Sequence, residues 1–138
     1  MIIDATNLII GRMSTFIAKK ALQGEQIDII NSEKAVITGD KKKLMAAYRR
    51  KREFGAPLVG PYFPRQPDKF VKRTIRGMLP YKQPRGLAAF KNIKCYVGVP
   101  EELKDKKPET IKEASIEKLS NIKYLTVNEI CKSMGATL

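Results

Sequence analysis

The alternation of apolar and polar residues predicts three short strands and one helix near the start of the chain. Ile and Val, which favour strands, are frequent in residues 2–5 (IIDA), 26–31 (QIDIIN) and 35–38 (AVIT). Between the first two segments, residues 10–23 place apolar side chains at helical spacing, and Gly24 is a suitable C-terminal stop. A strand, a helix and a second strand in this order predict a parallel βαβ unit.

Helical spacing and helix-ending residues predict three further helices in the middle of the chain. Their expected bounds are Asp40 to about Phe54, about Asp68 to Leu79, and Pro84 to Phe90. Residues 56–67 contain four prolines and therefore predict an extended loop. Residues 93–99 (IKCYVGV) are rich in strand-forming side chains and predict a fourth strand.

The composition of the chain changes after Pro100. The segment EELKDKKPET has charges of both signs and few large apolar residues, which is typical of a linker. Thr126 and Glu129 have the spacing of a capping box ahead of a short helix, which Gly135 can end. We therefore expect a single α/β domain over residues 1–100, followed by a charged linker and a short C-terminal helical extension over residues 101–138.

Positive charge is concentrated in one part of the sequence. The 138 residues include 27 Lys or Arg and 14 Asp or Glu, and the formal net charge is +13. Residues 41–94 contain 16 of the basic residues and 2 of the acidic ones, a net charge of +14, whereas the remainder has 11 and 12. A solvated helix face normally mixes both signs, so this excess indicates a polyanionic partner and makes residues 41–94 the expected binding region.

The residue types present argue against most enzymatic chemistry. The chain has no histidine, which removes the usual general base and the commonest metal ligand. Cys95 and Cys131 form no CxxC pair, and we interpret both as reduced core thiols. No apolar run approaches the roughly 20 residues that a membrane span needs. We expect a cytoplasmic protein that is not an enzyme and that uses no metal, cofactor, small-molecule substrate or membrane partner.

Two turns between a strand and a helix are candidate phosphate sites. TGDKKK at 38–43 lacks the spacing of a Walker motif, but its helix-start amides, with Lys41 and Lys42, could hold an RNA phosphate. Gly11 is a lone glycine and does not form a dinucleotide fingerprint. Arg12 beside it is either a solvated residue or a phosphate contact.

The helix expected from Asp68 to Leu79 has two distinct faces. Its apolar face consists of Phe70, Val71, Thr74, Ile75 and Met78. Its basic face consists of Lys69, Lys72, Arg73 and Arg76. We expect the first face to pack on the sheet and the second to meet RNA phosphates, so replacing the last three cations by Gln should hardly change the melting temperature.

Aromatic residues near these cations have two interpretations. Tyr62, Phe63 and Phe70 could stack on unpaired bases, although core packing is the favoured role for Phe70. The full set of candidate RNA-binding residues is Arg12, Lys41, Lys42, Lys43, Arg49, Arg50, Arg52, Arg65, Lys69, Lys72, Arg73, Arg76, Lys82, Arg85 and Lys91.

Four motifs in order resemble one known family. They are Asp4-Ala5-Thr6 with Gly11-Arg12, INSEKAVITGDKK at 30–42, IRGMLP at 75–80, and PRGLAAFKNIKCYVG at 84–98. Together they are similar to the thirteenth large-subunit ribosomal protein over nearly all of residues 1–100. The segments YKQPRGLAAF and 56–67 look more like archaeal and eukaryotic members than bacterial ones.

The resemblance implies a fold, an RNA partner and a place in the large ribosomal subunit. The implied fold is a three-layer α/β/α arrangement around a small, mainly parallel four-stranded sheet. The implied partner is large-subunit ribosomal RNA, with no catalytic activity. The tail after Pro100 matches no motif of the family, and we expect it to contact neighbouring ribosomal proteins. Two alternatives stay open: a regulator that binds messenger RNA outside the ribosome, and a small α/β enzyme that acts on a phosphorylated substrate.

Overall fold

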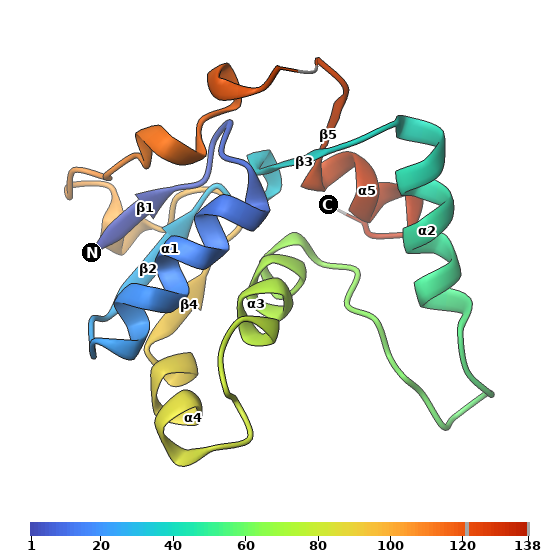
Figure 1. Cartoon of the computed structure of the whole chain (residues 1–138), viewed down its shortest axis with the longest axis horizontal. Helices are drawn as coiled ribbons and strands as arrows, with labels where there is room; N and C mark the ends of the chain where they lie inside the picture. The colour runs from blue at the N-terminus through green and yellow to red at the C-terminus, as the bar shows by residue number, and fades with distance from the viewer. Residues whose placement is uncertain (121, 138) are drawn as a thin grey trace.

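A three-stranded parallel sheet lies at the centre of the protein. The computed structural model describes residues 1–120 and 122–137. In it the strands have the order β1 (Ile2–Asp4), β2 (Ile27–Ile30), β4 (Ile93–Cys95), with Ile29 opposite both Ile3 and Cys95 (Figure 1). Helix α1 (Ile10–Leu22) connects β1 to β2. The expected parallel βαβ unit is therefore confirmed.

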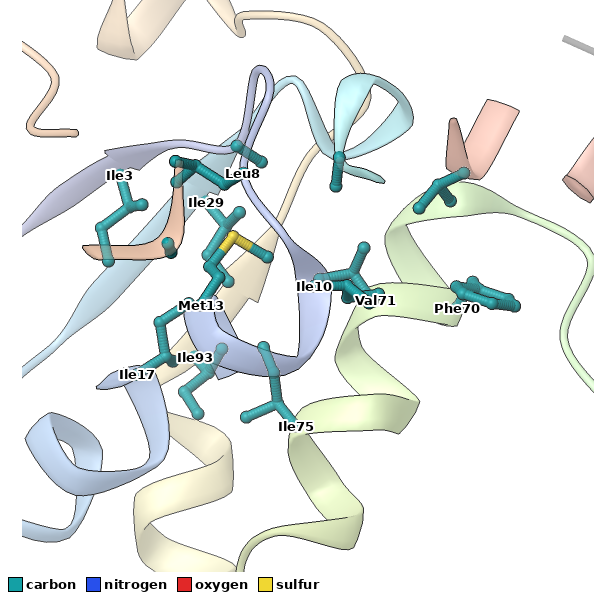
Figure 2. Packing of buried hydrophobic residues seen from close by; sticks show 14 of the residues in the cluster. Ile3, Leu8, Ile10, Met13, Ile17, Ile29, Phe70, Val71, Ile75 and Ile93 are labelled. Atoms are coloured by element: carbon teal, nitrogen blue, oxygen red, sulfur yellow. The ribbon is translucent and has the colours of Figure 1, made fainter. Parts of the chain in front are cut away.

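One face of this sheet supplies the centre of the hydrophobic core. Ile3, Ile29 and Ile93 are fully buried and face Met13 and Ile17 of α1 (Figure 2). Helices α3 (Pro67–Gly77) and α4 (Pro84–Lys91) pack beside α1 and against β4. The apolar positions that alternate along the strands and recur along the helices thus meet in a single cluster.

The opposite face of the sheet is more polar. Asp28 on β2 and Lys94 on β4 are neighbours in the register, and the Lys94 side chain is exposed. The α/β class and the mainly parallel sheet are confirmed.

The strand expected at 35–38 belongs to a second, smaller sheet. It forms β3 (Val36–Thr38), which pairs antiparallel with β5 (Tyr124–Thr126). Asn31 adopts a left-handed conformation, with φ of 54°, and leads into a short 3-10 turn over Ser32–Lys34. The chain changes direction there, so the central sheet has three strands and not the expected four.

The Asp4-Ala5-Thr6 motif explains how the end of β1 is held. The Asp4 carboxylate accepts hydrogen bonds from the Thr6 amide at 3.0 Å, the Thr6 hydroxyl at 2.7 Å and the Asn31 side-chain amide at 3.0 Å. Burial alone would raise the pKa of Asp4, but these hydrogen bonds and the charge of Lys34 outweigh it and lower the pKa. The motif is therefore a local hydrogen-bond network that links β1 to the turn after β2.

Residues after Pro100 pack on the earlier part of the chain. Glu109 extends β1 by two backbone hydrogen bonds, of 2.8 Å to Ile2 and 3.1 Å to Asp4. Three 3-10 turns, Glu101–Leu103, Lys112–Ala114 and Ile116–Lys118, precede β5. Helix α5 (Val127–Ser133) starts with the predicted capping box between Thr126 and Glu129 and places Ile130 and Met134 in the main core. A domain boundary at residue 100 stays a prediction.

Helix α2 (Lys41–Glu53) lies at the periphery and has no buried residue. It begins after Asp40 as predicted, but the Asp40 side chain makes no capping hydrogen bond. The chain then follows an extended path over residues 54–66 before α3 (Figure 1). That path includes the predicted loop at 56–67 except for Pro67, which already lies in α3.

Helix α3 differs from its predicted form at both ends. It begins at Pro67, because a proline at the first helical position loses no hydrogen bond, and it ends at Gly77. Met78 follows the helix and is 41% exposed, so the prediction that Met78 shares the buried face is wrong. Phe70, Val71 and Ile75 do lie in the core, as predicted.

Candidate nucleic-acid interface

The cations of α2 project from a helix that the core does not enclose. Lys41, Lys42 and Lys43 form its first turn, and Arg49, Arg50 and Arg52 lie in its last two turns, all exposed. The Arg52 guanidinium donates a hydrogen bond to the backbone carbonyl of Met134, at the end of α5. Helix α2 is thereby joined to the C-terminal part of the protein, beside which it lies in Figure 1.

Three of the four cations of α3 lie against aromatic rings. The charged groups of Lys72, Arg73 and Arg76 lie 5.0, 4.8 and 5.0 Å from the ring centroids of Phe90, Phe63 and Tyr81, respectively. Arg73 also donates a hydrogen bond of 2.7 Å to the carbonyl of Tyr62. Contacts of this kind limit the rotamers of the three side chains and keep them half-buried along one helix face.

Three aromatic rings join α2, the 54–66 segment and α3. Tyr48, Phe63 and Phe70 approach one another with centroid distances of 5.2 to 6.0 Å. Phe70 is 2% exposed, which confirms its predicted role in the core. Phe63 packs on the same cluster, and burial raises the pKa of Tyr48.

The basic residues meet in two adjoining grooves. The groove of about 540 Å³ between α2 and the 54–66 segment is lined by Ala47, Arg50, Lys51, Phe54, Pro61, Phe63 and Arg73. A groove of about 340 Å³ along α3 is lined by Tyr62, Pro64, Lys69, Lys72, Arg73, Arg76 and Phe90. Arg73 lines both grooves, so the structure brings cations from two helices together.

The remaining candidate residues lie around or apart from these grooves. Arg65, Lys82, Arg85 and Lys91 are exposed in the segment before α3, between α3 and α4, and on α4. Arg12 lies on α1 in a separate hollow lined also by Thr15, Phe16 and Ile111, and it shares neither groove.

Two cations near these grooves, Lys51 and Lys94, are not among the candidate RNA-binding residues predicted from the sequence. Lys51 lines the first groove, and Lys94 lines a hollow with Lys69, Lys72 and Tyr96. Lys51 belongs to the basic run at the end of α2, and strand alternation after the buried Ile93 would have placed Lys94 outward.

The positive charge of this region has no internal partner that neutralises it. Within residues 1–120 and 122–137, the ion pairs are Lys20 with Glu25 at 2.9 Å and Lys104 with Glu101 at 4.0 Å. Neither pair includes a cation of residues 41–94. Asp68 lines the hollow with Lys69, Lys72 and Lys94 but forms no ion pair with them, so an anion that approached this face would meet an excess of positive charge.

Metal binding, membrane insertion and thiol chemistry have little support in the described part of the chain. No group of three potential metal ligands occurs in it, and none of its helices is long and apolar enough to cross a membrane. Burial raises the pKa of Cys95 and of Cys131 to about 12, so both thiols are protonated near neutral pH. Cys131 is fully buried and Cys95 only partly so.

Comparison with known proteins identifies the family. The sequence profile described as "Ribosomal protein L13" matches residues 1–102. The chain belongs to this ribosomal protein family. The resemblance seen in the motifs of residues 1–100 is therefore confirmed.

Similar proteins extend the match through the C-terminal tail. The chain is 49% identical to the large ribosomal subunit protein uL13 of Methanosarcina barkeri, over 98% of this chain and 97% of that protein. It is 47% identical to the protein of that name from Archaeoglobus fulgidus, over 97% and 86% of the two chains. The large ribosomal subunit protein uL13 of Natronomonas pharaonis is 41% identical, over 100% of this chain and 92% of that protein. These relatives are archaeal, in line with the character of the 56–67 and 81–90 segments.

Proposed function

We propose that this protein is a structural component of the large ribosomal subunit and binds ribosomal RNA through the surface formed by α2, the 54–66 segment and α3. The main observation in support is that no described carboxylate forms an ion pair with the cations of residues 41–94. Their spacing over two helices suits an irregular phosphate backbone more than a single small ligand. The names of the relatives, which are large-subunit proteins, support the same conclusion.

The candidate residues have different roles in this proposal. Lys72, Arg73 and Arg76 are positioned by aromatic rings and provide fixed phosphate contacts. The α2 cations provide contacts that adjust to the RNA. Arg65, Lys82, Arg85 and Lys91 extend the same surface at its margins, and Arg12 provides a separate contact from α1. The C-terminal extension over residues 101–138 contacts neighbouring ribosomal proteins.

A catalytic role is not part of the proposal. The protonated thiols and the lack of histidine leave no activated nucleophile with a partner base among the described residues. The α2 start offers amides and lysines to a phosphate, but one glycine, Gly39, does not provide the nest of amides that a nucleotide triphosphate requires.

A salt titration tests the proposal directly. If about 6–10 phosphates are contacted, affinity for deproteinised large-subunit ribosomal RNA falls by roughly three to five orders of magnitude between about 50 and 200 mM salt. Filter binding at several salt concentrations measures the slope. A nearly flat titration would show that phosphate contacts do not dominate.

The alternative function is that of a regulator that binds messenger RNA outside the ribosome through the same basic surface. Sedimentation separates the two roles, because a structural component stays with large subunits through a high-salt wash. A protein that acts mainly on messenger RNA is recovered in the slow-sedimenting fraction instead.

A further inference from the structure

The groove between α2 and the 54–66 segment is larger and more apolar than the groove along α3, although cations and aromatic rings line both. Arg50, Lys51 and Arg73 surround apolar walls formed by Phe54 and Pro61. Its volume of about 540 Å³ lies within the range of about 300–1,000 Å³ that is usual for small-ligand pockets. Phosphate contacts alone would not require an apolar hollow of this size.

Phe54 is the more exposed of the two aromatic side chains that line this groove. It follows the last residue of α2 and is 68% exposed. In contrast, Phe63 contacts the rings of Tyr48 and Phe70 and lies under the guanidinium of Arg73. No ring or cation of the described residues stacks on Phe54, so one of its faces is available to a ligand.

The combination of a free ring with adjacent cations fits one chemical class. A nucleotide has a flat apolar base and a phosphate one sugar away, and base–aromatic stacking tolerates any base. A base within a duplex has both faces covered by its neighbours and could not reach the ring, whereas an unstacked base could. An acidic peptide would match the cations but would leave the Phe54 ring exposed.

We propose that this groove holds one unstacked nucleotide of the bound RNA, with its base on Phe54 and its phosphate beside Arg50 and Lys51. This inference rests on the proposed RNA-binding function and adds that the surface recognises an unpaired position. Arg73 orders the groove wall through its bond to Tyr62 and its contact with Phe63. The fixed phosphate contacts along α3 then position the strand from which the base turns out.

The first test compares single-stranded and duplex RNA with the full-length protein. The probes are a labelled twelve-nucleotide oligouridine strand and the duplex formed with its oligoadenosine complement. Phe54→Ala should weaken single-strand binding roughly five- to 150-fold, the effect of losing one base–aromatic stack. Duplex affinity should stay within about twofold of the parent, and Tyr124→Ala, another exposed aromatic change, should leave both affinities unaltered.

A fluorescence measurement makes the contact visible. Because the chain has no tryptophan, Phe54→Trp introduces a single indole that retains a stacking surface. Its emission should be quenched by the single strand and not by the duplex, and its single-strand affinity should match or exceed that of the parent. An unquenched indole, or parental single-strand affinity in Phe54→Ala, would overturn the inference.

The remaining outcomes separate this inference from the proposed function. Equal affinity of the parent for both RNAs, with a steep salt dependence, would refute the nucleotide groove and leave the RNA-binding function intact. Failure to bind either RNA at low salt would refute the function itself. In assembled large subunits, a photoreactive side chain at position 54 should cross-link to RNA, and a cross-link to protein alone would assign the groove to a protein neighbour.

Discussion

Helices α2 and α3 are both strongly basic, but the fold supports them in different ways. Phe70, Val71 and Ile75 anchor α3 in the main core, whereas α2 has no buried residue. Three of the four α3 cations, Lys72, Arg73 and Arg76, rest on aromatic rings, so these three have little rotamer entropy left to lose when they bind. Of the α2 cations, Lys51 alone lies over a ring among the described residues, 4.9 Å from the Tyr48 centroid. Positive charge therefore has two uses in this protein: a fixed contact surface on α3 and an adaptable one on α2.

The largest expected difference between the helices is in stability. Ile75→Ala should reduce the free energy of unfolding by about 2–5 kcal/mol, because it leaves a cavity at a fully buried position of α3. Leu44→Ala, at a half-buried position of α2, should cost clearly less. Urea unfolding followed by circular dichroism measures both. Similar losses would mean that α2 is as much part of the core as α3.

Removal of charge from α3 should affect both RNA binding and stability. The variant with Lys72→Gln, Arg73→Gln and Arg76→Gln loses three ring contacts, which together should cost about 1–3 kcal/mol. This replaces the expectation from sequence that the melting temperature would hardly change. The salt slope of RNA binding should fall by roughly one unit for each lost phosphate contact.

The matched change on α2 should affect RNA binding alone. The variant with Lys42→Gln, Lys43→Gln and Arg49→Gln removes the same charge from exposed positions with good helix formers. Its unfolding free energy should stay within about 0.5 kcal/mol of the parent, while its salt slope falls as in the α3 variant. A stability loss as large as that of the α3 variant would remove the distinction between the two helices.

The last difference between the helices concerns the hydrogen bond that the Arg52 side chain of α2 donates to the carbonyl of Met134, the residue after α5. Arg52→Gln removes the bond to the Met134 carbonyl and should cost about 0.5–1.5 kcal/mol. Hydrogen exchange should increase in α2 and remain unchanged in α3, because only α2 depends on that contact. Uniformly faster exchange in both helices would contradict an independent attachment of α2.

Local signals in the sequence predicted much of this fold. The βαβ unit follows from the spacing of apolar residues within each segment. The capping box of Thr126 and Glu129 can be recognised within four consecutive residues. The partner of β3 could not be predicted in this way, because β5 follows more than eighty residues later. Met78 continues the helical spacing, but the helix ends one residue earlier and the spacing no longer applies.

The same limit applies to the candidate interface. Its cations could be predicted from the sequence, because the excess of Lys and Arg in residues 41–94 can be counted without knowing which residues are neighbours in space. The rings of Phe90 and Tyr81 that hold Lys72 and Arg76 come from other segments. The Phe54 groove likewise depends on how the 54–66 segment returns to α3, which no periodicity encodes.

The pairing of β3 with β5 has a consequence for the order of events during synthesis. At about 5–20 residues per second, a ribosome takes several seconds to add the stretch between these two strands. During that interval the nascent chain has β1, α1 and β2 but an open backbone edge at Val36–Thr38, of the kind that invites association with other strands. The polypeptide can close this edge only when Tyr124–Thr126 have left the exit tunnel, so the smaller sheet forms several seconds after the strands of the central βαβ unit have been made.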